Sequence, residues 1–156
     1  MSSSPQIAKH FREVFTGGNW TAVNLKDSLA NVDWQQATTK VHNLNTIAAL
    51  VFHINYYINA VLKVLQGERL KASDKYSFDL QPIHSEDEWQ KLVSKVFEDA
   101  ELFAQKIESL DDKKLFEEFE DPKYGNYYRN FLGIIEHTHY HLGQIVLIRK
   151  IINEPK

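Results

Sequence analysis

Two histidines spaced four residues apart stand in the last apolar stretch of this 156-residue chain, in the run HTHYHLGQ that begins at His137. Residues four apart on a helix lie one above the other, so the imidazoles of His137 and His141 could hold one metal ion between them. Gln144 continues that face one turn further on, where it could orient a ligand or a bound water. Because such pairs also arise by chance in ordinary helices, the spacing indicates a metal site only if there is a third ligand.

His53 is the candidate third ligand. It lies midway along a second apolar stretch, beside a stripe of residues three or four apart. A histidine next to a core stripe can also be a hydrogen-bonded core residue, and both interpretations stay open at this point. Bundles of long helices assemble metal sites from inward-projecting side chains, and the three histidines taken together favour that arrangement.

The other four histidines are not expected to bind the same ion. His139 is rotated by roughly 200° from His137 on an ideal helix, because each residue advances the helical wheel by about 100°. His10, His42 and His84 lie in or near less regular segments. We expect them to be surface or capping residues, a common use of a half-buried polar ring.

Apolar residues recur at helical spacing along almost the whole chain, and strict alternation is scarce, which predicts an all-α fold. The pattern predicts four long helical segments, at about residues 6–29, 44–66, 85–110 and 126–152. The first is interrupted at the double glycine Gly17–Gly18, and a short extra helix is expected within residues 111–120. The polar stretch 68–84 is too long for a tight turn. We therefore predict a four-helix bundle with one long crossover between helices 2 and 3, built as a single domain over residues 1–156.

Local signals mark the ends of the segments on either side of the crossover. Gly67 supplies a C-terminal cap for the second segment, because glycine readily adopts the left-handed conformation that ends many helices. Ser85 followed by Glu88 has the spacing of a capping box and opens the third segment.

The composition excludes several classes of protein and site. The chain has no cysteine, which rules out disulfides, thiolate zinc sites, iron–sulfur clusters and a cysteine nucleophile. Any metal must therefore sit on nitrogen and oxygen. Eighteen basic and 21 acidic residues give a formal charge of −3 with no basic block, so we expect no nucleic acid and no membrane as partner. The first residues lack the pattern of a signal peptide, and we expect a cytoplasmic protein.

His53 in an apolar second helix, followed far downstream by His137-x-x-x-His141-x-x-Gln144, resembles the DinB/YfiT-like superfamily of metal-dependent four-helix-bundle proteins. The resemblance spans nearly the whole chain and includes the region of Trp20 in the first helical segment. It implies that the three histidines are the metal ligands and that the remaining coordination positions are open to water or substrate. Histidine nitrogen suits several divalent metals; zinc or nickel is the expectation, with manganese or iron as alternatives.

Characterised members of this superfamily include transferases and isomerases that use a low-molecular-weight thiol such as bacillithiol, mycothiol or glutathione. The resemblance therefore implies a small-molecule substrate and a metal that binds such a thiol as thiolate, strengthening it as a nucleophile. Many relatives carry another histidine before the last ligand and a basic residue after it, where this chain has Tyr140 and Leu142. The resemblance does not extend to contacts made by those two positions.

Two other functions remain open. A hydrolase would use the same ion to deliver hydroxide, but it needs a general base, and Glu136 points about 100° away from the adjacent ligand. The lack of an evident base favours thiol activation, although no catalytic residue can be assigned. A metal-binding or stress-associated module without turnover is the second alternative, because histidines from two helices would cross-link them in any case. A catalytic site should open into a polar-lined pocket, whereas a structural site should be closed.

The last helical segment is apolar over more than one face, with several residues away from the His137 side: Leu132, Ile135, Leu142 and Val146. Either full burial or a homodimer surface would explain this distribution. We expect a homodimer.

Overall fold

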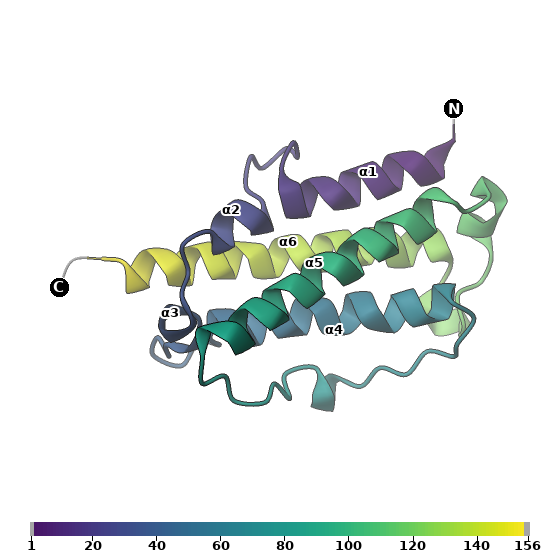
Figure 1. Ribbon diagram of the computed structural model, residues 1–156. Helices are drawn as coiled ribbons and strands as arrows, with labels where there is room; N and C mark the ends of the chain where they lie inside the picture. The colour runs from purple at the N-terminus through teal and green to yellow at the C-terminus, as the bar shows by residue number, and fades with distance from the viewer. Residues whose placement is uncertain (1, 155–156) are drawn as a thin grey trace.

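Four long helices run side by side in the computed structural model, which describes residues 2–154 (Figure 1). They are α1 (Ser3–Thr16), α4 (Ile47–Leu65), α5 (Glu86–Glu108) and α6 (Tyr127–Ile152). Helix α1 packs against α5 and α6, and α4 packs against the same two helices, so α1 and α4 lie at opposite corners. The described residues form no β-strand, only one isolated bridge between Glu118 and Asn126. The prediction of an all-α fold is confirmed.

Shorter elements lie in the connections. Helices α2 (Leu25–Leu29) and α3 (Trp34–Thr38) lie between α1 and α4, and two 3-10 turns, η2 (Asp112–Phe116) and η3 (Pro122–Tyr124), precede α6. The crossover from α4 to α5 runs back along α4 and contains one 3-10 turn, η1 (Asp74–Tyr76) (Figure 1). The long crossover expected between the second and third long helices is therefore present.

The segment after the double glycine differs from the prediction. We expected the first helix to resume at Trp20, but only Leu25–Leu29 is helical there, and the Trp20 side chain is 99% exposed. Asn19 explains part of the difference, because its side-chain amide donates to the carbonyls of Glu13 and Val23 at 2.6 and 2.8 Å. An asparagine that bonds nearby backbone in this way stabilises a turn in place of a helix.

The helix ends follow local side-chain chemistry. Helix α4 ends in a Schellman motif, in which the N–H groups of Gly67 and Glu68 donate to the carbonyls of Val64 and Lys63, both at 3.0 Å. Gly67 has a φ of +93°, as its predicted capping role requires. The predicted capping box of α5 is only half formed. The Ser85 hydroxyl accepts from the Glu88 N–H, but the Glu88 carboxylate accepts from the backbone of His84.

The start of α4 and the expected helix at 111–120 also need correction. Leu44 lies outside α4 and is exposed, because the Thr46 side chain caps the helix by accepting from the Ala49 N–H. The expected helix at 111–120 is the 3-10 turn η2, shorter than predicted.

One hydrophobic core lies between the long helices. Helix α4 is its most apolar member and is long and apolar enough to cross a membrane, with a mean hydropathy of 1.4. However, 61% of that stretch is buried inside the protein, as in the core helix of a soluble protein. Of the apolar stripe predicted for this helix, Ile47, Val51, Ile54, Ile58 and Val61 are buried, and Leu65 is only partly buried. This burial fixes the face of α4 that carries His53.

Candidate metal centre

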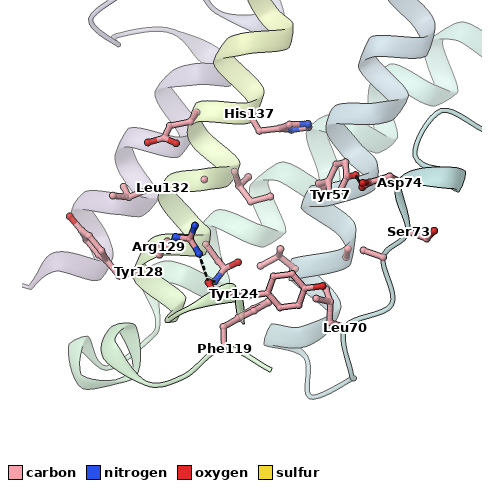
Figure 2. Close-up of a pocket in the computed structure, with 17 residues that line it drawn as sticks. Tyr57, Leu70, Ser73, Asp74, Phe119, Tyr124, Tyr128, Arg129, Leu132 and His137 are labelled. Atoms are coloured by element: carbon pink, nitrogen blue, oxygen red, sulfur yellow. Dashed lines mark hydrogen bonds between the residues drawn. The ribbon is translucent and has the colours of Figure 1, made fainter. Parts of the chain in front are cut away.

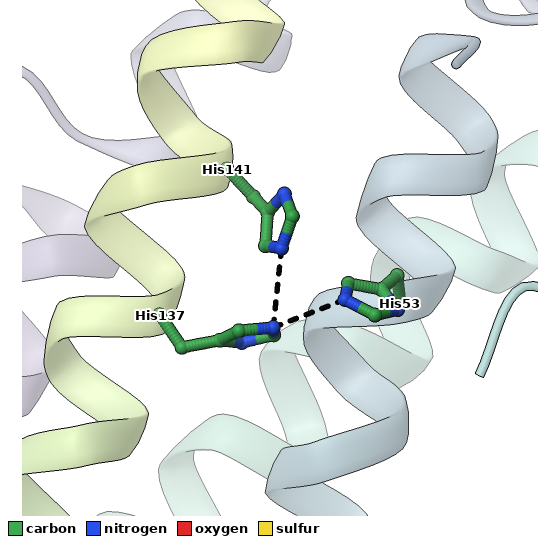
Figure 3. Close-up of side chains that lie close together, drawn as sticks. All are labelled: His53, His137 and His141. Atoms are coloured by element: carbon green, nitrogen blue, oxygen red, sulfur yellow. Dashed lines mark hydrogen bonds between the residues drawn. The ribbon is translucent and has the colours of Figure 1, made fainter. Parts of the chain in front are cut away.

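The structure brings His53, His137 and His141 together across the interface between α4 and α6 (Figure 3). The Nε2 atom of His137 lies 3.0 Å from Nε2 of His53 and 3.1 Å from Nε2 of His141. The candidate ligand atoms of all three residues lie within 4.8 Å of one another. His137 and His141 meet because they are one turn apart on α6, and His53 reaches them from the flank of the buried stripe of α4.

Hydrogen bonds on the outer side of two rings determine which nitrogen faces inward. The Nδ1 of His53 lies 3.2 Å from the Ser77 carbonyl oxygen, and the Nδ1 of His141 lies 2.7 Å from Oε1 of Gln144. Both partners can only accept, so each Nδ1 carries a proton. In the neutral form of each ring, the Nε2 atoms of His53 and His141 therefore present lone pairs to the space between the rings, as metal ligands do.

The position of the His137 ring fits a shared metal ion better than it fits hydrogen bonds among the three histidines alone. A single Nε2 proton on His137 could be donated to only one of the two facing lone pairs at full strength. Metal–nitrogen bonds of about 2.1 Å at tetrahedral or octahedral angles would separate the nitrogens by about 3.0–3.4 Å, which agrees with the two distances from His137 Nε2. With its proton on Nδ1, which is buried and has no partner among the described residues, His137 would be a third ligand.

Burial favours the neutral form of His137 and His53. It lowers the pKa of His137 to about 4, and the neighbouring His141 and His53 add to the shift. Burial also lowers the pKa of His53, partly offset by the hydrogen bond to Ser77. Only a neutral imidazole can bind a metal, so the lone pair of His137 remains available well below pH 7, and the shift at His53 acts in the same direction.

The crossover covers this group of histidines, which the sequence analysis did not foresee. The Phe78 ring stacks on His53 with centroids 3.8 Å apart and an angle of 8° between the planes. The Tyr57 ring packs edge-on against His53 and His137, with centroids 5.2 and 5.0 Å away. The Tyr57 hydroxyl donates to Asp74, and burial together with this bond raises its pKa to about 12.

A sequence signal existed for some of these contacts. Tyr57 follows His53 by one helical turn, so it had to share the face of α4 that carries the ligand. Phe78 is an aromatic residue within a polar stretch, but nothing in its spacing indicates what it packs against.

The remaining histidines lie outside the group, as predicted. His139 faces another side of α6, and its pKa is lowered by burial and by the neighbouring His10. His10, His42 and His84 are exposed.

A cavity of about 860 Å³ opens beside His137, between α4, α6 and the connections at one end of the molecule (Figure 2). Its lining mixes apolar, aromatic and charged side chains, among them Tyr57, Leu70, Asp74, Phe119, Arg129 and His137. The candidate metal centre is therefore next to open space large enough for a small molecule.

These observations define an all-helical protein with a group of three histidines able to hold a divalent metal beside an accessible cavity. The sequence model of the DinB superfamily matches residues 19–145, most of the chain and all three histidines. The chain therefore belongs to the DinB superfamily. Comparisons with curated proteins and with solved structures each give no match.

Proposed function

We propose that this protein is a divalent-metal-dependent enzyme built on a DinB-like four-helix bundle, with His53, His137 and His141 as the metal ligands. We further propose that it activates a low-molecular-weight thiol for transfer to an electrophilic carbon. The observation that carries the proposal is the convergence of three imidazole nitrogens at the edge of a cavity. Zinc or nickel is the proposed ion, with manganese or iron as alternatives.

The cavity favours catalysis over a purely structural metal site. Structural sites are closed by four protein ligands, whereas catalytic sites keep coordination positions open to solvent or substrate. Here the described residues supply three ligands, and His137 lines the cavity. A metal-binding module without turnover needs no such space, so it is the weaker proposal.

The residues of this chain divide the work of such a site. A bound divalent ion would lower the pKa of a coordinated thiol or water towards neutrality. The Ser77 carbonyl oxygen accepts from Nδ1–H of His53, and Oε1 of Gln144 accepts from Nδ1–H of His141. These two hydrogen bonds hold the orientation of the rings. Phe78 covers the face of the His53 ring, and Tyr57, which also lines the cavity, packs edge-on against His53 and His137, so a nucleophile would approach His137 from the cavity.

Hydrolysis is the second candidate function, because one observation favours it. Asp74 lines the same cavity and accepts a hydrogen bond from Tyr57, which contacts His137. A carboxylate in that place could accept a proton from an attacking water. An Asp74→Asn variant separates the two proposals, since hydrolysis should collapse while transfer of a pre-formed thiolate should continue.

Metal analysis tests the proposal directly. Protein purified without an affinity tag and exposed to zinc, nickel and manganese should hold about one equivalent of metal, the stoichiometry of a single site. A triple variant, His53→Ala with His137→Ala and His141→Ala, should hold none, while the matched control His139→Ala should retain it. Equal metal content in parent and triple variant would refute the metal site. Thiols assayed against electrophiles with the metal-loaded parent then test turnover.

A homodimer remains a proposal. Burial inside the chain already accounts for Ile135 and Leu142, which we had considered for the interface. The outer side of α6 still exposes Tyr140 by 65% and Leu147 by 55%, and a second copy could cover them. Light scattering after size exclusion should give twice the chain mass of 18.2 kDa, and a single chain mass would reject the dimer.

A further inference from the structure

The cavity beside His137 extends along one row of α6. Arg129, Gly133 and His137 are spaced four residues apart, so they lie one above another on the same side of the helix, and all three line the cavity. Eight residues of helix separate the first from the last, a rise of about 12 Å. Figure 2 shows Arg129 near the Tyr124 loop and His137 further along α6.

Gly133 leaves the middle of this row open. A Cβ atom built on Gly133 would have no other atom within 4 Å apart from its own helix and chain neighbours. Glycine inside a helix costs about 1 kcal/mol relative to alanine. No close packing contact of the described residues requires a glycine here, and its missing side chain gives an unobstructed path from Arg129 to His137.

The two ends of the path differ in charge. At the His137 end, Asp74 and Glu136 both line the cavity. At the other end, Arg129 forms no ion pair within the described residues, and its hydrogen bond to the Tyr124 carbonyl is long at 3.3 Å. Arg12, in contrast, is held by the carboxylates of Glu101 and Glu108. The Arg129 guanidinium therefore retains most of its capacity to bind an anion.

Part of the cavity wall is apolar and aromatic. Val61 and Ile134 line the cavity, and Phe119 lines it near Tyr124, at the Arg129 end (Figure 2). Phe119 is held by edge-on packing against Tyr124 and Tyr127, so this wall is positioned before any ligand arrives. An elongated ligand with an apolar body fits such a lining.

We propose that Arg129 forms a carboxylate-binding subsite, and that the cavity takes an elongated ligand whose carboxylate lies at Arg129 while its reacting group lies at His137. A carboxylate matches the planar fork of a guanidinium, which can donate two parallel hydrogen bonds to it. Asp74 and Glu136 disfavour the reverse orientation. This inference rests on the proposed function, because it assigns the reacting group to the metal centre.

Mercaptoalkanoates of increasing chain length are suitable probes, with mercaptoalcohols of the same length as neutral controls. Their thiolates bind cobalt(II) substituted into the site, and the resulting charge-transfer absorption reports binding at the metal. Chains able to span about 12 Å should bind about tenfold more tightly as acids than as alcohols, and shorter chains should show no difference.

Variants separate the subsite from the metal centre. Arg129→Gln should abolish the tenfold advantage of the acids and leave binding of the alcohols unchanged, while Arg129→Lys should restore part of it. Gly133→Leu should weaken binding of long acids and long alcohols alike, whereas Gly143→Leu, on the same helix outside the cavity, should affect neither. Both Arg129 and Gly143 are exposed enough for their variants to fold.

Each outcome decides a different question. Alcohol thiols that give no charge-transfer band in cobalt-treated protein would refute the proposed metal function. If the band appears but acids and alcohols of every length bind equally, the Arg129 subsite is refuted and the metal centre stands. An advantage of the acids that survives in Arg129→Gln would likewise overturn the subsite.

Discussion

The lowered pKa of His137 predicts that the metal-free protein loses stability in mild acid. The unfolded chain binds a proton at His137 near pH 6.5, whereas the folded protein resists it down to about pH 4. Between these values the unfolded state binds more protons, so the free energy of unfolding rises with pH. The contribution of neutral His137 to the free energy of unfolding is therefore fully present above pH 6.5, and it declines as the pH falls towards 4.

The size of the effect follows from the shift. A difference of 2.5 pKa units, from 6.5 to about 4, sets an upper limit of about 3.4 kcal/mol at 1.36 kcal/mol per unit. His137 borders the cavity and is partly open to solvent, which reduces the cost of charging it. We therefore expect about 1–2 kcal/mol to be lost between pH 7 and pH 4.5.

Urea unfolding in the presence of a chelator measures this loss. His137→Gln replaces the imidazole by a polar side chain that does not titrate, so the variant should lose about 1–2 kcal/mol less than the parent over the same pH range. Acidic groups titrate in both proteins and cancel in the comparison. The exposed His42→Gln serves as control and should follow the parent. Parallel pH profiles of parent and His137→Gln would show that His137 is not held neutral by the fold.

Three further predictions concern residues around the site and at the start of α1. Gly133→Ala and Gly143→Ala should each stabilise the protein by about 1 kcal/mol in urea unfolding, since both Cβ atoms meet open space; a loss of stability at Gly133 would contradict the open path. Gln144→Leu should keep one bound metal but weaken its affinity 10–100-fold in a competitive chelator titration, because His141 loses its orienting partner. The Asp112 carboxylate accepts from the N–H groups at the start of α1, which holds its pKa well below the usual range. The stabilising contribution of the Asp112 carboxylate is therefore lost as the pH falls below about 4. Asp112→Asn should lower the melting temperature at pH 7 and make the melting temperature depend less on pH in acid.

The sequence was most informative where the relevant contacts are local. The pairing of His137 with His141 depends only on helical periodicity, and the bond from His141 to Gln144 joins residues three apart on the same helix. The apolar residues three or four apart on α4 identified the buried face of that helix in the same way, by helical periodicity. That His53 would meet the other two depends on the packing of α4 against α6; the expectation of a helical bundle favoured it and the family resemblance implied it, whereas periodicity alone could not indicate it.

The crossover was the least predictable part of the site. Ser77, Phe78 and Asp74 stand about twenty residues after the residues they contact on α4, in a stretch with neither helical nor strand periodicity. Their role depends on where a long loop returns over the helices, and loop closure leaves no regular pattern in a sequence. Trp20 shows an error of another kind, a helix predicted where the structure has none. It was expected within the first helical segment, but the hydrogen bonds of Asn19 stabilise a turn there, and Trp20 lies in solvent.

The crossover also explains how the tautomer and the burial of His53 are set. Helices α4 and α6 alone would leave one side of His53 open to water, and hydration would favour protonation and rotation of the ring. The Ser77 carbonyl fixes the Nδ1 proton, and Phe78 covers the ring face. Asp74 holds Tyr57, whose ring covers His137. The same loop that gave no sequence signal thus sets the tautomer and the burial of His53, while the row from Arg129 to His137 leaves the cavity side of His137 open to a ligand.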